Sequence, residues 1–266
     1  MICKRLLILV AKLVKVLRLL WRALTPFSLF TDNQSVKQNR ILLTVLVLLF
    51  LVVLAPISAQ DVLRGEVKIE LEPIYGGFVE DEYPLQTETI YRRALELAAM
   101  FFSAQIYGWS FYYDIGERAR GIAEEFELSP LGEIQWGDPR LNVTHANLHN
   151  FVFSAWMDYR PSEMQKMRID MWRTGSIRSA QAHGFGPLGS PVEPTDWLTI
   201  RKTALEDAAR AAVRAMLQGS ERNRPKEATG FISLQNFPAF WMDRGRWAAS
   251  ARFRVDIREV IPFAAH

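Results

Sequence analysis

Two matching segments decide the fold, Ile90–Ala99 (IYRRALELAA) and Ile200–Ala209 (IRKTALEDAA). Alanine, leucine and glutamate are strong helix formers, so both segments are predicted to lie in alanine-rich helices. The first helix follows Thr87, an expected cap, and the second runs from near Asp196 to Gly219. Apolar residues at helical spacing predict a buried face on each helix. They are Tyr91, Ala94, Leu95, Ala98, Phe101 and Phe102 in the first, and Leu205, Ala208, Ala209, Ala212, Val213 and Met216 in the second.

Two glutamates of these segments are expected on the outer side of their helices. Glu96 follows Arg92 by four residues, a spacing that favours an ion pair on an exposed helix surface. Glu206 has the same position in the second segment as Glu96 has in the first. Both side chains are therefore expected to be exposed.

Strands are predicted around these helices by the alternation of apolar and polar residues. Val67–Glu72 and Phe151–Tyr159 alternate, and short glycine-adjacent strands are expected at Leu131–Ile134 and Gly230–Leu234. Arg246–Val260 alternates most clearly, which is typical of an antiparallel strand with one solvent face. Its apolar residues are Trp247, Ala249, Ala251, Phe253, Val255 and Ile257.

The sequence thus predicts an α+β fold in which antiparallel sheets pack against alanine-rich helices. The chain contains the same order of elements twice: an alanine-rich helix, then a short glycine-adjacent strand, then a long alternating strand. This repetition favours a duplicated helix-strand-strand unit. Chance is the alternative, because alanine, leucine and glutamate are common in any helix. The layout resembles periplasmic and flagellum-associated envelope proteins that pack an alanine-rich helix on a small antiparallel sheet. No diagnostic motif assigns a family.

Two features lie between the matching parts. Ser162 and Gln165 form a capping-box pattern, which predicts a short helix with Met164, Met167 and Met171 on one side. The glycine- and proline-rich residues 175–194 are interpreted as a loop or linker. This linker separates a first α+β half, residues 60–174, from a second half, residues 195–266.

Residues 36–59 have the anatomy of a secretory signal. The uncharged apolar run Ile41–Ile57 follows a basic stretch and ends at the small residues Ser58 and Ala59. Cleavage after Ala59, favoured by Pro56, would release the protein into the periplasm. Retention of residues 41–57 would instead anchor the protein in the inner membrane, with its C-terminal domain outside the cytoplasm.

Residues 1–35 form a basic leader, which has two interpretations. One is a cationic amphipathic helix on the cytoplasmic membrane face. The other is a segment that is not translated, because a start near Val36 leaves a signal peptide of ordinary length.

Charge separates the leader from the rest of the chain. The whole chain has 32 basic residues (Lys and Arg) and 29 acidic residues (Asp and Glu). Residues 1–59 hold 8 of the basic residues and 1 of the acidic residues. Residues 60–266 therefore hold 24 basic and 28 acidic residues, a net charge of −4. The exported part is therefore not expected to bind nucleic acid. The chain's lone cysteine, Cys3, lies in the leader. Residues 60–266 therefore form no disulfides and must be stabilised by their own core.

No motif in the exported part predicts catalysis, a cofactor or a metal. The residues around His145 and His149 lead into a predicted strand, where residues four apart are separated by about 13 Å. The two are therefore interpreted as surface or turn histidines, and no metal site is expected. Gly184–Gly189 spells GxGxxG, but Pro187 prevents the helix that a nucleotide site requires, so no cofactor is expected. Carboxylate pairs such as Glu124 with Glu125, or Asp158 with Asp170, are interpreted as solvated. Catalytic residues are not assigned.

Aromatic residues suggest a binding surface. Trp109, Phe111, Tyr112 and Tyr113 are close together, and such side chains stack on sugars or anchor protein interfaces. The alternative is that they build the core.

The favoured interpretation is a non-enzymatic bacterial envelope protein that binds or scaffolds envelope proteins or cell-wall glycan in the periplasm. One alternative is a cell-wall or glycan-acting hydrolase with unidentified carboxylates. Another is a membrane-tethered accessory subunit of an envelope complex.

Overall fold

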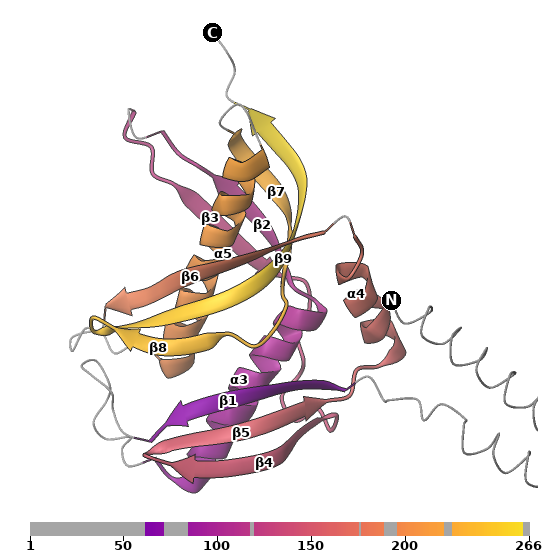
Figure 1. Cartoon of the computed structure of the whole chain (residues 1–266), viewed down its shortest axis with the longest axis vertical. Helices are drawn as coiled ribbons and strands as arrows, with labels where there is room; N and C mark the ends of the chain where they lie inside the picture. The colour runs from indigo at the N-terminus through magenta and orange to yellow at the C-terminus, as the bar shows by residue number, and fades with distance from the viewer. Residues whose placement is uncertain are drawn as a thin grey trace, which may run out of the picture. The chain divides into compact units, whose positions relative to one another are not determined.

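Two antiparallel sheets and three helices make up the described part of the chain (Figure 1). The structure is a computed structural model that describes residues 62–71, 85–117, 120–175, 177–188, 196–220 and 225–262. These residues belong to one compact unit, which extends from Gln60 to His266. The elements in chain order are β1 (Leu63–Glu70), α3 (Thr87–Ile106), β2 (Trp109–Asp114), β3 (Glu125–Pro130), β4 (Leu141–His149), β5 (Val152–Tyr159), α4 (Glu163–Trp172), β6 (Arg178–Leu188), α5 (Trp197–Ser220), β7 (Pro225–Leu234), β8 (Ala239–Asp243) and β9 (Arg246–Pro262).

The first sheet has three strands in the order β1-β5-β4. Phe153, Ala155, Met157 and Tyr159 of β5 are buried, whereas Trp156 on the other face is 41% exposed. This is the alternation predicted from the sequence. Helix α3 packs on β1 and β5, and its alanines Ala94 and Ala98 are fully buried. The edge strand β4 is largely exposed.

The second sheet has the order β3-β2-β7-β9-β6, and β8 also pairs with β9. It joins strands from both predicted halves, because β2 pairs antiparallel with β7. Helix α5 packs on β6 and β9, and Figure 1 shows it lying across this sheet. The predicted burial of Ala251, Phe253 and Val255 in β9 is confirmed. The α+β class with antiparallel sheets packed against alanine-rich helices is confirmed as well.

A buried arginine links α5 to the first sheet. Arg201 is 4% exposed and forms an ion pair with Glu70 of β1. Its guanidinium also lies 4.2 Å from the ring centroid of Trp247 and 4.9 Å from that of Trp197. A charge buried this deeply requires such partners.

The glycine-rich segment was wrongly expected to be a loop, because residues 178–188 form β6. Gly184 lies directly against α5, where an added Cβ would come 2.0 Å from the Ala208 nitrogen and 2.4 Å from the Ala204 oxygen. Glycine is needed here for close contact between strand and helix, and not for a turn. Gly184, the first glycine of the GxGxxG spelling, therefore serves packing.

Other local expectations need correction. The N-cap of α3 is Gln86, with no side-chain cap hydrogen bond, and Thr87 is the first helical residue. The buried stripe of α3 includes Ile90, Arg93 and Leu97. Of the predicted stripe, Tyr91 is 39% exposed and Leu95 is half-buried. The buried face of α3 is therefore rotated about the helix axis from the predicted one. Residues 131–134 form a loop, and the strand that follows α3 is β2.

The capping box of α4 is confirmed. The Ser162 hydroxyl accepts from the Gln165 amide, and the Gln165 side chain accepts from the Ser162 amide at 2.8 Å. The helix buries Gln165, Ile169 and Trp172. Its methionines Met164, Met167 and Met171 lie on one side, as predicted, but are 69%, 55% and 59% exposed.

Predictions for residues 1–59 fall outside the described residues. Of the helices that the structure describes, none has both the length and the hydropathy needed to cross a bilayer.

Candidate functional site

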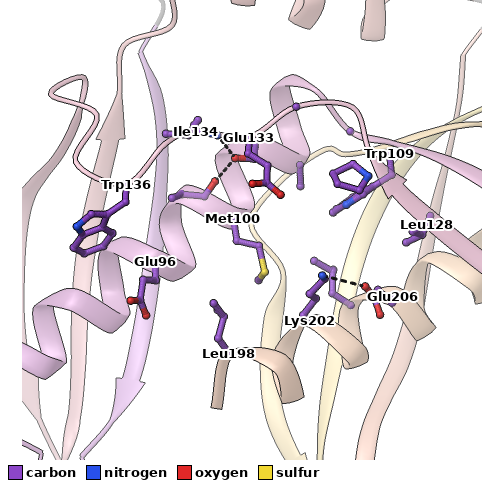
Figure 2. A pocket seen from close by; sticks show the side chains of 17 residues that line it. Glu96, Met100, Trp109, Leu128, Glu133, Ile134, Trp136, Leu198, Lys202 and Glu206 are labelled. Carbon is purple, nitrogen blue, oxygen red and sulfur yellow. Dashed lines mark hydrogen bonds and ion pairs between the residues drawn. The ribbon is translucent and has the colours of Figure 1, made fainter. Parts of the chain in front are cut away.

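A cavity of about 330 Å³ lies between the two alanine-rich helices (Figure 2). Helix α3 forms one wall and the first turns of α5 form another. The ends of β2 and β3 and the loop at residues 132–136 complete it. The lining residues are Glu96, Ala99, Met100, Ser103, Ala104, Gly108, Trp109, Leu128, Pro130, Gly132, Glu133, Ile134, Trp136, Leu198, Lys202, Leu205 and Glu206.

The loop wall is fixed to α3 by a serine. The Ser103 hydroxyl donates to the Ala99 carbonyl at 2.6 Å and accepts from the Ile134 amide at 2.8 Å. Gly132 packs on Tyr107, whose ring would meet an added Cβ at 2.8 Å. Because Ile134 is also 7% exposed, the loop is held by both packing and hydrogen bonding.

Glu96 and Glu206 face this cavity, so the expectation that they are exposed outer residues is wrong. Their side chains are 33% and 40% exposed. Arg92 lies 4.0 Å from the Glu96 carboxylate and Lys202 lies 3.9 Å from that of Glu206. The predicted Arg92–Glu96 pair is thus present, although its acidic member also lines the cavity.

Burial is the largest cause of raised pKa values for both carboxyls. For Glu96, burial and the charge of Asp196 raise the pKa, whereas Arg92 and Arg93 lower it. For Glu206, burial raises the pKa and Lys202 lowers it. Neither carboxylate is among the causes of the other's pKa shift.

Aromatic and aliphatic side chains form most of the remaining lining. Trp109 is half-buried where β2 enters the cavity, and Trp136 is 62% exposed at the cavity's edge. In Figure 2, Met100 and Leu198 lie between Glu96 and Lys202. A mainly apolar hollow with a few polar groups is the usual form of a small-molecule site.

Of the four aromatic residues singled out in the sequence, only Trp109 lines the cavity. Phe111 and Tyr113 are 3% and 1% exposed and belong to the core. Tyr112 is half-buried on the opposite face of β2. The Tyr113 hydroxyl donates to Glu124 at 2.8 Å and accepts from Arg214 at 3.1 Å, so its polar end is already bonded.

None of the three histidines that the structure describes lines this cavity. His145 and His149 are exposed on β4, which confirms their strand context. His183 lies edge-on to Trp241, with ring centroids 5.9 Å apart. Within the described ranges, no three residues of the His, Cys, Asp and Glu types are grouped as metal ligands would be.

Comparison with known proteins identifies a matching family. A protein-family profile matches residues 53–263, well over half of the chain. The chain belongs to that family. It is also similar to an uncharacterised protein of Treponema pallidum (strain Nichols), with 23% identity over 171 residues, which cover 64% of this chain and 69% of the relative. No solved structure matches.

Proposed function

We propose that this protein is an exported component of a bacterial envelope that binds a ligand without converting it. The observation that carries the proposal is the cavity between α3 and α5, with carboxylates and tryptophans around an apolar interior. The periplasmic location rests on the signal-like residues 36–59, and mature protein beginning at Gln60 is the expected form.

Binding suits this cavity better than hydrolysis does. Ser103, the only hydroxyl-bearing lining residue, is already bonded to Ala99 and Ile134 and holds the wall in place. In a retaining glycosidase, the carboxyl groups of the acid and the nucleophile lie about 5 Å apart. At that distance each carboxyl group strongly shifts the pKa of the other. Neither Glu96 nor Glu206 is among the causes that shift the pKa of the other, so these pKa shifts give no support to such a pair.

Fluorescence titration with the neutral apolar dye N-phenyl-1-naphthylamine tests ligand binding in the cavity. Saturable binding should be lost in Ala99→Phe, which fills the space, and kept in Ala215→Phe, which places the same ring on an exposed part of α5. Equal binding by both variants would mean that the dye binds elsewhere. Absence of saturable binding to the wild-type protein would contradict the proposal.

The hydrolase alternative makes a different prediction. A glycan-acting enzyme should release fragments from purified peptidoglycan, and Glu96→Gln or Glu206→Gln should abolish the release. Under the binding proposal, neither the wild-type protein nor these variants release fragments.

An edge strand supports a scaffolding role beside ligand binding. Strand β4 pairs only with β5 among the described elements, and nearly all of its residues are exposed. Its sequence LNVTHANLH contains no Lys, Arg, Asp, Glu or Pro, which are the residues that usually protect an edge. A bulge between Val143 and His145 is the one protective feature of this edge. An extended segment of an envelope protein is a suitable partner for it.

The second candidate function is that of a membrane-tethered accessory subunit, favoured by the exposed methionines of α4. Three large apolar side chains on one side of a short helix are typical of a contact surface. Photo-crosslinking from position 167 in envelope fractions should then give a discrete adduct that position 88, exposed on α3, does not give. Recovery of residues 41–57 in the native protein would support the tether.

We also propose that the two halves arose by duplication, with the second half beginning at β6 and not after the predicted linker. Strand β1 precedes α3 and pairs with β5, as β6 precedes α5 and pairs with β9. The hairpin β4–β5 corresponds to β8–β9, and β2 corresponds to β7. The cavity then lies between equivalent helices, and Glu96 and Glu206 are equivalent residues.

A further inference from the structure

We propose that the cavity between α3 and α5 binds a small organic cation, an ammonium group carried on an apolar body. This inference rests on the proposed binding function and names the chemical class of the ligand. Charge, aromatic side chains and the shape of the interior each support it.

The charged lining residues favour a cation. Glu96, Glu133 and Glu206 are acidic, and Lys202 is the one basic residue among the residues that line the cavity. Because Lys202 lies 3.9 Å from Glu206, its charge is largely offset there. Arg92 pairs with Glu96 from outside the lining, where its side chain is 58% exposed. Glu133 is exposed. The lining therefore has an excess of negative charge, which opposes an anionic ligand.

Besides carboxylates, organic cations prefer contact with aromatic ring faces, and two tryptophans, Trp109 and Trp136, line the cavity. The face of an indole ring attracts an ammonium within about 6 Å, and tryptophan is the strongest of the aromatic side chains in this respect. Arginines already occupy other rings of this protein, since Arg93 and Arg201 lie over Trp197. In the described residues, no arginine or lysine lies over Trp109 or Trp136. These two rings can therefore receive a ligand cation.

Aliphatic side chains account for the apolar body. Met100, Leu128, Leu198 and Leu205 line the interior between the charged residues. A volume of about 330 Å³ is at the lower end of the range for small-molecule sites, so the ligand is a small molecule and not a folded domain. A long unbranched methionine side chain adapts well to such a body.

The titration of the carboxyls agrees with this assignment. Burial raises the pKa values of Glu96 and Glu206, so the cavity disfavours their charged forms when it holds no cation. A bound ammonium would stabilise the carboxylates and lower both pKa values.

Three molecules of the same length separate the effect of charge from that of shape. They are 4-phenylbutylamine, 4-phenylbutanol and 4-phenylbutyrate, each titrated by calorimetry into the full mature protein. The amine should bind at least tenfold more tightly than the alcohol, and the acid should not bind. The double variant Glu96→Gln/Glu206→Gln should lose about tenfold in amine affinity and keep its affinity for the alcohol. Glu88→Gln, an exposed change on the same helix α3, should match the wild type.

Each other outcome has a definite meaning. Equal or tighter binding of the alcohol, or an amine affinity unchanged in the double variant, would overturn the cationic ligand while leaving the binding function intact. No binding of the amine or the alcohol, together with no binding of the neutral dye, would overturn both. Thermal unfolding of the double variant establishes that its cavity is folded.

Discussion

Gly184 of β6 lies against Ala208 of α5, so closely that a Cβ on the glycine would come 2.0 Å from the alanine's backbone nitrogen. Strand and helix touch here through their backbones, with no side chain between them. This contact brings α5 down onto the second sheet and thereby sets one wall of the cavity.

Gly184→Ala should therefore destabilise the protein. The new methyl group meets backbone atoms that cannot rotate away, and overpacking of this kind costs about 1 to 3 kcal/mol. Urea unfolding measures the difference. Gly175→Ala is the matched control, because nothing lies within 4 Å of its added Cβ, and its effect should stay below about 0.5 kcal/mol. Similar values for the two variants would show that the contact is looser than described.

The buried alanines of both helices should behave alike. Ala98 and Ala208 are 0% exposed, so Ala98→Leu and Ala208→Leu should each cost about 1 to 3 kcal/mol in unfolding free energy. Ala215→Leu makes the same change on an exposed part of α5 and should be nearly neutral. A harmless Ala98→Leu or Ala208→Leu would contradict the packing of that helix on its sheet.

Much of this packing could be predicted from the sequence, since alternation in β5 and β9 and the capping box of α4 depend on local spacing. Strand β6 could not, because glycine and proline signal a turn in one context and close packing in another. At Gly184 the contact with Ala208 of α5 requires close packing and not a turn, and the sequence around Gly184 does not show this contact because Ala208 lies on another element. Glu96 likewise resembled a surface residue with an i,i+4 partner, and Glu206 resembled its exposed counterpart in the second helix. The cavity combines α3, α5 and the loop at 132–136, and only the matching positions of the two glutamates hinted at it.

Ser103→Ala should loosen the cavity wall. The change leaves the Ile134 amide without its acceptor, and a buried unsatisfied donor costs about 1 to 3 kcal/mol. Hydrogen exchange at Ile134 should accelerate, and affinity for N-phenyl-1-naphthylamine should fall. Ser110→Ala, which removes only an exposed hydrogen bond to Ser129, should change neither quantity.

Asp138 should contribute to stability in a pH-dependent way. The Arg140 side chain is the largest cause that lowers the pKa of Asp138 from 3.8 to about 2, with the Tyr159 hydroxyl donating to the same carboxylate. Because the folded pKa is depressed, the stabilisation is present above about pH 4 and is lost as the pH falls toward 2. Asp138→Asn should therefore cost roughly 2 kcal/mol at pH 7.

The difference between wild type and Asp138→Asn should shrink steadily between pH 4 and pH 2, as measured by urea unfolding at each pH. Because both proteins contain the same other carboxyls, the effect of their titration cancels in the difference between the two unfolding free energies. A difference that stays constant with pH would mean that the Arg140 contact does not stabilise the charged form.

The central claim is that the cavity between α3 and α5 binds an organic cation, and methyl NMR of labelled methionine tests it most directly. Met100 lines the cavity, whereas Met164, Met167 and Met171 are exposed on α4. Addition of 4-phenylbutylamine should shift the Met100 methyl resonance in a saturable manner and leave the three α4 resonances in place. A Met100 resonance that stays unchanged at saturating amine, or shifts confined to the α4 methionines, would contradict the claim.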